Sequence, residues 1–169
     1  MKLFEFTPKK NANKLAAITG ILIIGAVLLL CITVILGELA YRWILQLAGI
    51  IMLTAGVFIT SRYVMKSYVY SIIEVDGGND LTVTEIQCRH TITVCRISIS
   101  GIEQIYVVDK KDREAYGEVK KKAKAGARKR FNYCADFLEQ KYICILCTEC
   151  GESLAIELSW DESLERLLA

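Results

Sequence analysis

The stretch that decides the fold is Leu15–Leu36, LAAITGILIIGAVLLLCITVIL, which is followed after a short polar break by Trp43–Thr60, WILQLAGIIMLTAGVFIT. Neither run contains Asp, Glu, Lys, Arg or His. As helices they would be about 33 and 27 Å long, close to the roughly 30 Å of a bilayer's hydrocarbon core. The sequence therefore predicts a two-helix transmembrane hairpin over residues 15–62.

The first run is expected to stay in the mature protein as a span. It is longer than the apolar region of a signal peptide, which holds about 7–15 residues. The candidate small residue after it, Ala40, has Glu38 at the −3 position, where signal cleavage prefers a small side chain. Because ionisable groups inside spans usually mark a transport path, their absence predicts an anchor and argues against a transporter.

Small residues in both runs allow helix backbones to approach closely. We expect them to pack the two spans against each other, and the alternative is a face for dimers or for a membrane partner. The residues concerned are Ala12, Ala16, Gly20, Gly25, Gly49 and Gly56.

Basic residues on the flanks predict the orientation of the hairpin, because cytoplasmic loops carry an excess of Lys and Arg. They precede the first span and follow the second, whereas the connecting loop Gly37–Arg42 has Arg42 against Glu38. Both termini are therefore expected in the cytoplasm of a plasma-membrane protein. In that reducing compartment the six Cys of the tail are expected as free thiols or metal ligands. The flanking bases are Lys2, Lys9, Lys10, Lys14, Arg62 and Lys66.

After residue 67 the pattern changes to short runs of β-forming residues with period-two alternation. Turns are predicted at 76–79 and 149–152, and a bulge near Cys95–Arg96, where the apolar positions change parity. Ser159, with Glu162 three residues later, predicts the N-cap of a last helix that has Leu164, Leu167 and Leu168 on one side. The predicted strands are 68–75, 81–86, 91–99, 105–108, 131–137, 142–148 and 153–158.

These elements predict a mainly-β domain of six to seven antiparallel strands, in a curved sheet or barrel, with a C-terminal helix. The order resembles bacterial pleckstrin-homology-like domains that follow a membrane hairpin. The resemblance is carried by the strand Tyr68–Val75, by Arg96–Val108 (RISISGIEQIYVV) and by the terminal hairpin with its Trp160-bearing helix. It implies a cytoplasmic binding or assembly domain over residues 67–169, without an assigned reaction. Residues 1–14 are expected as a cytoplasmic segment.

Cysteines are the first candidate for chemistry. Cys144, Cys147 and Cys150 form Cys-x-x-Cys-x-x-Cys, but residues three apart on a strand face opposite sides, so Cys144 and Cys147 should not chelate together. Cys147 and Cys150 remain metal candidates, and a zinc site would need two further ligands. Those would come from Cys88, Cys95, Cys134 or the single histidine, His90. Packing thiols are the preferred interpretation, and no cofactor is expected.

A basic insertion at residues 110–130 is the second candidate, expected as helix or as a disordered segment. Between Glu118 and Arg130 it has seven bases and one acid. The alternatives are a solvated segment that balances acids of its own domain and a contact with anionic lipid headgroups. Nucleic acid is not expected, because no aromatic residue lies among the bases for stacking. The bases are Lys120, Lys121, Lys122, Lys124, Arg128, Lys129 and Arg130.

The sequence leaves three functional hypotheses. The first is a non-enzymatic, membrane-anchored module whose cytoplasmic domain binds a protein partner or the anionic membrane surface. The second is a subunit or assembly factor that packs through its hairpin in a larger complex or a homo-oligomer. The third is a zinc- or thiol-dependent sensor. Acids such as Glu152 and Glu157 are interpreted as solvated residues.

Overall fold

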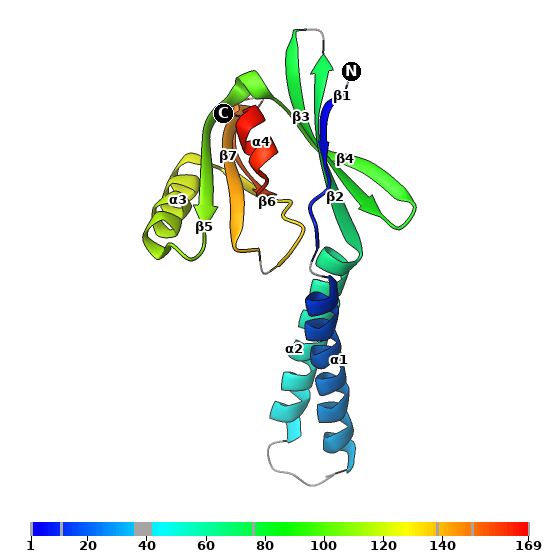
Figure 1. Cartoon of the computed structure of the whole chain (residues 1–169). Coiled ribbons are helices and arrows are strands. Elements are labelled where there is room, and N and C mark those ends of the chain that lie inside the picture. Colours follow the sequence, from blue (N-terminus) through cyan, green and yellow to red (C-terminus); the bar gives the residue numbers. More distant parts are fainter. Residues whose placement is uncertain are drawn as a thin grey trace. The chain divides into compact units, whose positions relative to one another are not determined.

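The computed structural model describes residues 2–10, 12–35, 42–75, 77–137, 139–149 and 151–168 (Figure 1). The chain forms two compact units. One is Asn11–Lys66, and the other, called the β domain below, combines Met1–Lys10 with Ser67–Ala169. A single domain is thus assembled from both flanks of the apolar segment.

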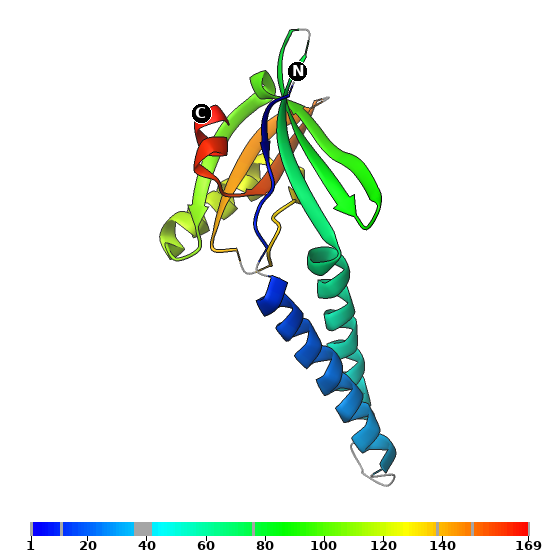
Figure 2. The same cartoon turned by 45° about the vertical axis from the view of Figure 1, so that its right-hand side comes forward.

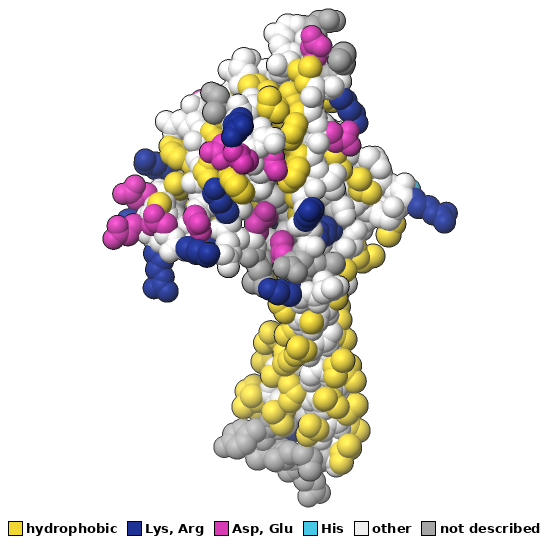
Figure 3. Space-filling model, in the orientation of Figure 1, with side chains coloured by type: hydrophobic (Ala, Val, Ile, Leu, Met, Phe, Trp, Pro, Cys, Tyr) yellow, Lys and Arg dark blue, Asp and Glu magenta, His cyan; other side chains and the backbone are white. Residues whose placement is uncertain are grey.

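The first unit is a helical hairpin of α1 (Ala12–Ile35) and α2 (Arg42–Ile59), and a π-helical turn continues α2 over Thr60–Val64. Its helices run side by side in both ribbon views (Figure 2). Their mean hydropathy reaches 2.9 and 2.0, so both are long and apolar enough to cross a membrane. Hydrophobic side chains cover most of the hairpin's length on the face shown in Figure 3, whereas both signs of charge spread over the β domain.

Small residues pack the hairpin, as predicted. A Cβ added at any of three glycines would stand only 3.0–3.1 Å from a side-chain atom of the opposite helix: Gly25 faces Met52, Gly49 faces Leu30, and Gly56 faces Ile23. Gly20 differs, because nothing lies within 4 Å of its added Cβ. Three of the four predicted glycines are therefore used inside the hairpin itself.

The first sheet of the β domain has the order β1-β2-β3-β4. Its strands are β1 (Lys2–Phe6), β2 (Lys66–Val75), β3 (Gly78–Gln87) and β4 (His90–Ser98). β1 pairs antiparallel with β2, with Phe4 opposite Ile72 and Phe6 opposite Tyr70. This strand was not predicted, because residues 1–14 were expected as a segment without a place in the domain.

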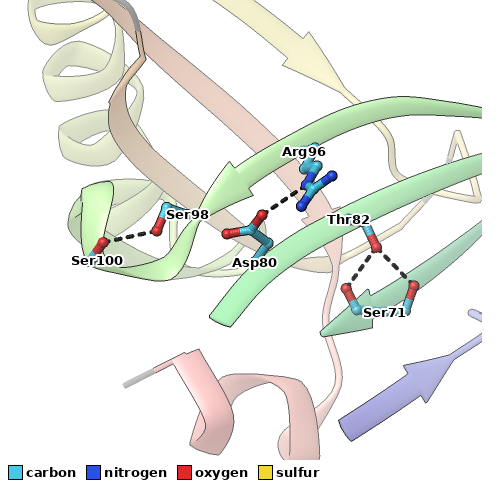
Figure 4. Close-up of polar contacts among 6 residues, drawn as sticks. All are labelled: Ser71, Asp80, Thr82, Arg96, Ser98 and Ser100. Carbon is cyan, nitrogen blue, oxygen red and sulfur yellow. Dashed lines mark hydrogen bonds and ion pairs between the residues drawn. The ribbon is translucent and has the colours of Figure 1, made fainter. Parts of the chain in front are cut away.

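Cross-strand polar contacts fix the register of this sheet (Figure 4). The hydroxyls of Ser71 and Thr82 lie 2.9 Å apart, and Arg96 Nε donates to Asp80 Oδ2 at 2.8 Å. Val83 pairs with Cys95 and the next residue pairs with Thr93, which leaves one residue of β4 unpaired. The predicted bulge is therefore confirmed, one residue before Cys95.

The second sheet has the order β5-β7-β8-β6 and includes one parallel pair. Its strands are β5 (Ile102–Asp109), β6 (Lys129–Asn132), β7 (Lys141–Glu149) and β8 (Glu152–Ser159), and a 3-10 turn at Ile99–Gly101 leads into it. The prediction of a wholly antiparallel arrangement is wrong, since β6 runs parallel to β8. The strand expected at 131–137 ends at Asn132. The two four-stranded sheets do not close into a barrel.

Two helices complete the β domain, α3 (Arg113–Gly126) and α4 (Glu162–Leu168). The basic insertion is thus helical over most of its length, and Asp112 caps it by accepting from Ala115 N at 3.1 Å. The predicted N-cap of the last helix is wrong. Asp161 Oδ1 accepts from the N–H groups of residues 163 and 164, at 2.9 and 3.1 Å, whereas Ser159 is a buried residue of β8.

The second sheet is covered on both faces. Its inner face packs against the first sheet and α4 through Tyr70, Leu81, Ile145, Ile156, Leu158 and Leu164. Its outer face packs against α3 through Val108, Val119, Ala123, Cys144 and Ala155 (Figure 1). Leu168 joins the inner core but Leu167 is 51% exposed, so the predicted three-leucine face is wrong at that residue. Burial of one aliphatic side chain in these cores stabilises the folded state by about 1.5–3 kcal/mol.

Candidate functional site

The seven predicted basic residues fall into two groups. Lys120, Lys121, Lys122 and Lys124 belong to α3 and are called the α3 lysines below. Arg128, Lys129 and Arg130 lie at or in β6 and are called the β6 bases. The two groups differ in what their charges contact.

The β6 bases pair with acids of their own domain. Lys129 Nζ lies 2.5 Å from one carboxylate oxygen of Glu152, and Arg128 Nη1 lies 3.8 Å from the other. Arg130 donates to Glu157 Oε1 through Nε at 2.9 Å and also through Nη2. These contacts tie β6 to β8, and the two acids offset two of the three positive charges.

Glu157 is buried, which corrects its interpretation as a solvated residue. Its side chain is 6% exposed, whereas that of Arg130 is 40% exposed. Burial alone would lower the pKa of Arg130, but the hydrogen bond to Glu157 and its charge raise the pKa overall. The guanidinium is therefore held charged, and it neutralises a carboxylate that water hardly reaches.

Three of the α3 lysines keep their charge available, namely Lys120, Lys121 and Lys122. Val119 and Ala123 face the second sheet, and Lys121 is exposed. Lys120 Nζ lies 5.4 Å from the centroid of the Tyr116 ring and Lys122 Nζ lies 5.6 Å from that of Tyr106, distances at which a ring attracts a cation. Within the described part of the chain, no carboxylate forms an ion pair with residues 120, 121 or 122.

Three of the described cysteines of the β domain are buried, Cys134, Cys144 and Cys147, whereas Cys88 is exposed. Cys144 lies in the outer core and Cys147 in the inner core, so the prediction that they face opposite sides is confirmed. Cys150, the other metal candidate, lies outside the described residues. Among those that are described, no group of three or more His, Cys, Asp or Glu side chains is placed to hold a metal ion.

Burial also sets the protonation of these thiols. It raises the pKa of both Cys95 and Cys144 to about 11, and it raises the pKa of Cys134 further. Because the thiolate is the reactive form, these three groups are kept in their unreactive form at neutral pH.

A buried polar network that the sequence did not predict links the two sheets. Tyr70 Oη donates to the carbonyl of Tyr133 at 2.8 Å and accepts from Ser159 N at 3.1 Å. Ser159 Oγ donates to Glu139 Oε2 at 2.7 Å and accepts from Ala135 N at 3.0 Å. The segment between β6 and β7 is thereby fixed to β2 and β8, which is a structural role.

Glu139 titrates abnormally because of this setting. Burial raises its pKa, and the nearby charge of Asp136 adds to the effect, while the hydrogen bond from Ser159 and the charge of Lys110 oppose it. The net result is a carboxyl group that takes up a proton more readily than a solvated one.

Comparisons of the chain with protein-family models, with characterised proteins and with solved structures found no match.

Proposed function

We propose that this chain is a two-span protein of the plasma membrane and that its β domain is a cytoplasmic, non-enzymatic binding module. The surface that we assign to binding is formed by two of the α3 lysines, Lys120 and Lys121. Its partner is the anionic inner surface of the membrane in which the hairpin is anchored.

The pairing of β1 with β2 carries this proposal. β1 precedes the hairpin and β2 follows it, yet Phe6 lies opposite Tyr70 in one sheet. If β1 and β2 lay on opposite sides of a bilayer, they could not pair. An open sheet cannot span the hydrocarbon, because its backbone polar groups would be unsatisfied there. Both flanks of the hairpin must therefore lie on the same side, so the hairpin crosses twice or does not cross at all.

Length and composition favour two crossings. The most apolar 18-residue windows of the two 23-residue segments have a mean hydropathy of 2.9 and 2.0, and hydrophobic side chains of both helices are widely exposed, as lipid contact requires. The bases on the flanks of the hairpin, such as Lys9, Lys14 and Lys66, favour the cytoplasmic side for the β domain.

The order of elements supports the pleckstrin-homology-like assignment. Four consecutive strands make the first sheet, β5, β7 and β8 make the antiparallel part of the second, and α4 follows at the C-terminal end. In this interpretation the hairpin is inserted between the first two strands, and α3 with β6 is an insertion before β7.

The electrostatics favour the α3 lysines over the β6 bases as the docking surface. Each Lys or Arg near an anionic leaflet contributes about 1 kcal/mol, within a Debye length of about 8 Å. The segment between β1 and α1 is only residues 7–11, and β2 begins directly after the π-helical turn. Short links of this kind hold the domain close to the leaflet in which the hairpin ends.

Paramagnetic relaxation would test the docking in the full chain. The protein would be placed in nanodiscs that carry a gadolinium-labelled headgroup lipid, with or without phosphatidylserine, and broadening would be followed at the α3 amides. Phosphatidylserine should increase broadening at Lys120 and Lys121. Replacing both by Gln should remove about 2 kcal/mol, a roughly 30-fold change in the docking equilibrium.

The matched control is the pair Arg128→Gln and Lys129→Gln, which removes the same charge from the same segment but from side chains that already pair with Glu152. It should keep most of the broadening. Equal loss in both double variants, or broadening that ignores phosphatidylserine, would reject docking through α3. Crosslinks from the β domain to a protein on native membranes would then assign the module to that partner.

A further inference from the structure

A groove of about 500 Å³ lies where the C-terminal half of α3 crosses the second sheet. Residues of β5, α3, β7 and β8 line it, and Lys121 is not among them. Its volume falls in the range of about 300–1,000 Å³ that is typical of small-molecule sites.

The shape of the groove follows from two local features. The pairing of β5 with β7 shifts register between Ile102 and Gln104, so Glu103 is an extra residue on the wall. α3 ends at Gly126, where an added Cβ would stand 3.8 Å from Leu146 Cδ1. A longer side chain at position 126 would occupy the groove, and its absence leaves the space open.

Hydrogen-bond donors dominate the polar lining. The hydroxyl of Tyr106 donates to the Gln104 carbonyl oxygen, so the two N–H groups of that amide remain as donors. Lys122 adds its ammonium group, which lies over the Tyr106 ring. The one acid of the lining, Glu103, accepts from the hydroxyl of Thr148 at 2.6 Å.

The rest of the lining is apolar. On the face of the sheet that α3 covers, Leu146 and Ala125 are apolar residues of the lining, whereas the side chain of Leu154 packs against the inner core. Apolar walls with a few placed donors are the usual composition of a site for a small organic ligand.

We propose that this groove binds a small organic anion whose carboxylate or phosphate group contacts Lys122 and Gln104 while its apolar body lies on Leu146 and Ala125. A cation is disfavoured by the ammonium group, and a fully polar anion would leave Leu146 uncovered. The inference does not depend on membrane docking, because it uses the groove side of α3.

Methyl NMR of the full chain in zwitterionic nanodiscs would test the proposal, with labelled Leu146 and Ala125 as reporters inside the groove. Hexanoate and hexyl phosphate are the probes, and hexanol is the uncharged control. At least one of the two anions should shift both methyl groups in a saturable manner, and the anion that does so identifies the head group. Hexanol should produce no saturable shift.

Lys122→Gln should weaken binding about tenfold or more, as expected when a charged hydrogen-bond donor is lost, whereas Lys121→Gln on the same helix should leave it unchanged. Gly126→Leu should abolish binding by filling the groove, and Gly126→Ala is its matched control, because a Cβ there meets Leu146 at an ordinary contact distance. The proposal is overturned if neither anion saturates, if hexanol binds equally well, or if Lys122→Gln binds like the wild type.

Discussion

Replacing Arg130 by Met should destabilise the β domain by about 2–3 kcal/mol. Methionine keeps an aliphatic stem but removes both donors to Glu157, whose side chain is only 6% exposed. Breaking a fully buried ion pair costs about 3–5 kcal/mol, because an uncompensated charge stays buried. The Arg130 side chain is 40% exposed, so water offsets part of that cost, and the expected loss is about 2–3 kcal/mol.

Lys129→Met is the control, since it removes the same charge from the neighbouring residue of the same strand. Lys129 pairs with Glu152 while their side chains are 55% and 37% exposed, and such surface pairs contribute about 0–1 kcal/mol. Urea unfolding followed by Trp160 fluorescence, with Trp43→Phe as background, measures both variants. With a slope of about 1–3 kcal/mol per molar urea, Arg130→Met should lower the midpoint by roughly 0.7–3 M. Equal midpoints for the two variants would refute a structural role for Arg130.

Three further predictions concern other parts of the chain. Burial raises the pKa of Glu139, so the folded state holds a proton more readily than the unfolded state. The free energy of unfolding of the wild type should therefore fall relative to that of Glu139→Gln as pH rises from the ordinary carboxyl value of 4.5. Urea midpoints of the two proteins that stay parallel across pH would contradict this. Gly56→Leu should speed amide exchange in α1, because Ile23 leaves no room for a side chain at position 56, whereas Gly20→Leu should not. Equal exchange rates in the two variants would show that the helix packing is wrong. Phe6→Ala should destabilise the β domain by roughly 1–2 kcal/mol, less than a fully buried Phe, and an unchanged midpoint would exclude β1 from the core.

The strands with one face in the core could be predicted from sequence. In β8, Leu154, Ile156 and Leu158 face the inner core, as their period-two spacing predicts. The opposite placement of Cys144 and Cys147 followed from the same geometry. These predictions needed only information that is local along the chain.

β1 could not be predicted because its stabilising partner is distant in sequence. Phe4-Glu5-Phe6 does alternate, but a strand of five residues is too short to be distinguished from a flanking segment. Its place in the sheet depends on β2, which the whole hairpin separates from it. The sequence contains the alternating residues, but it does not show the pairing with β2 that makes this segment a strand.

The basic insertion shows why a charge run is ambiguous in sequence. Lys121 and Arg130 have the same charge and lie in one run, yet one is exposed on a helix and the other is bonded to a buried acid. The difference arises because β6 pairs with β8, a parallel contact that local periodicity does not encode. The interpretation of Glu157 as a solvated residue is wrong for the same reason, since its burial depends on elements outside its own strand.

The side of the membrane from which lysines are labelled tests whether one domain is built from both flanks of a two-span hairpin. A membrane-impermeant amine reagent would be applied to right-side-out and inside-out vesicles that hold the full chain, and labelled peptides would be identified by mass spectrometry. Lys2, in β1, and Lys121, on α3, are both exposed. The account predicts that both are labelled in inside-out vesicles and that neither is labelled in right-side-out vesicles. Labelling of the two residues from opposite sides would contradict it.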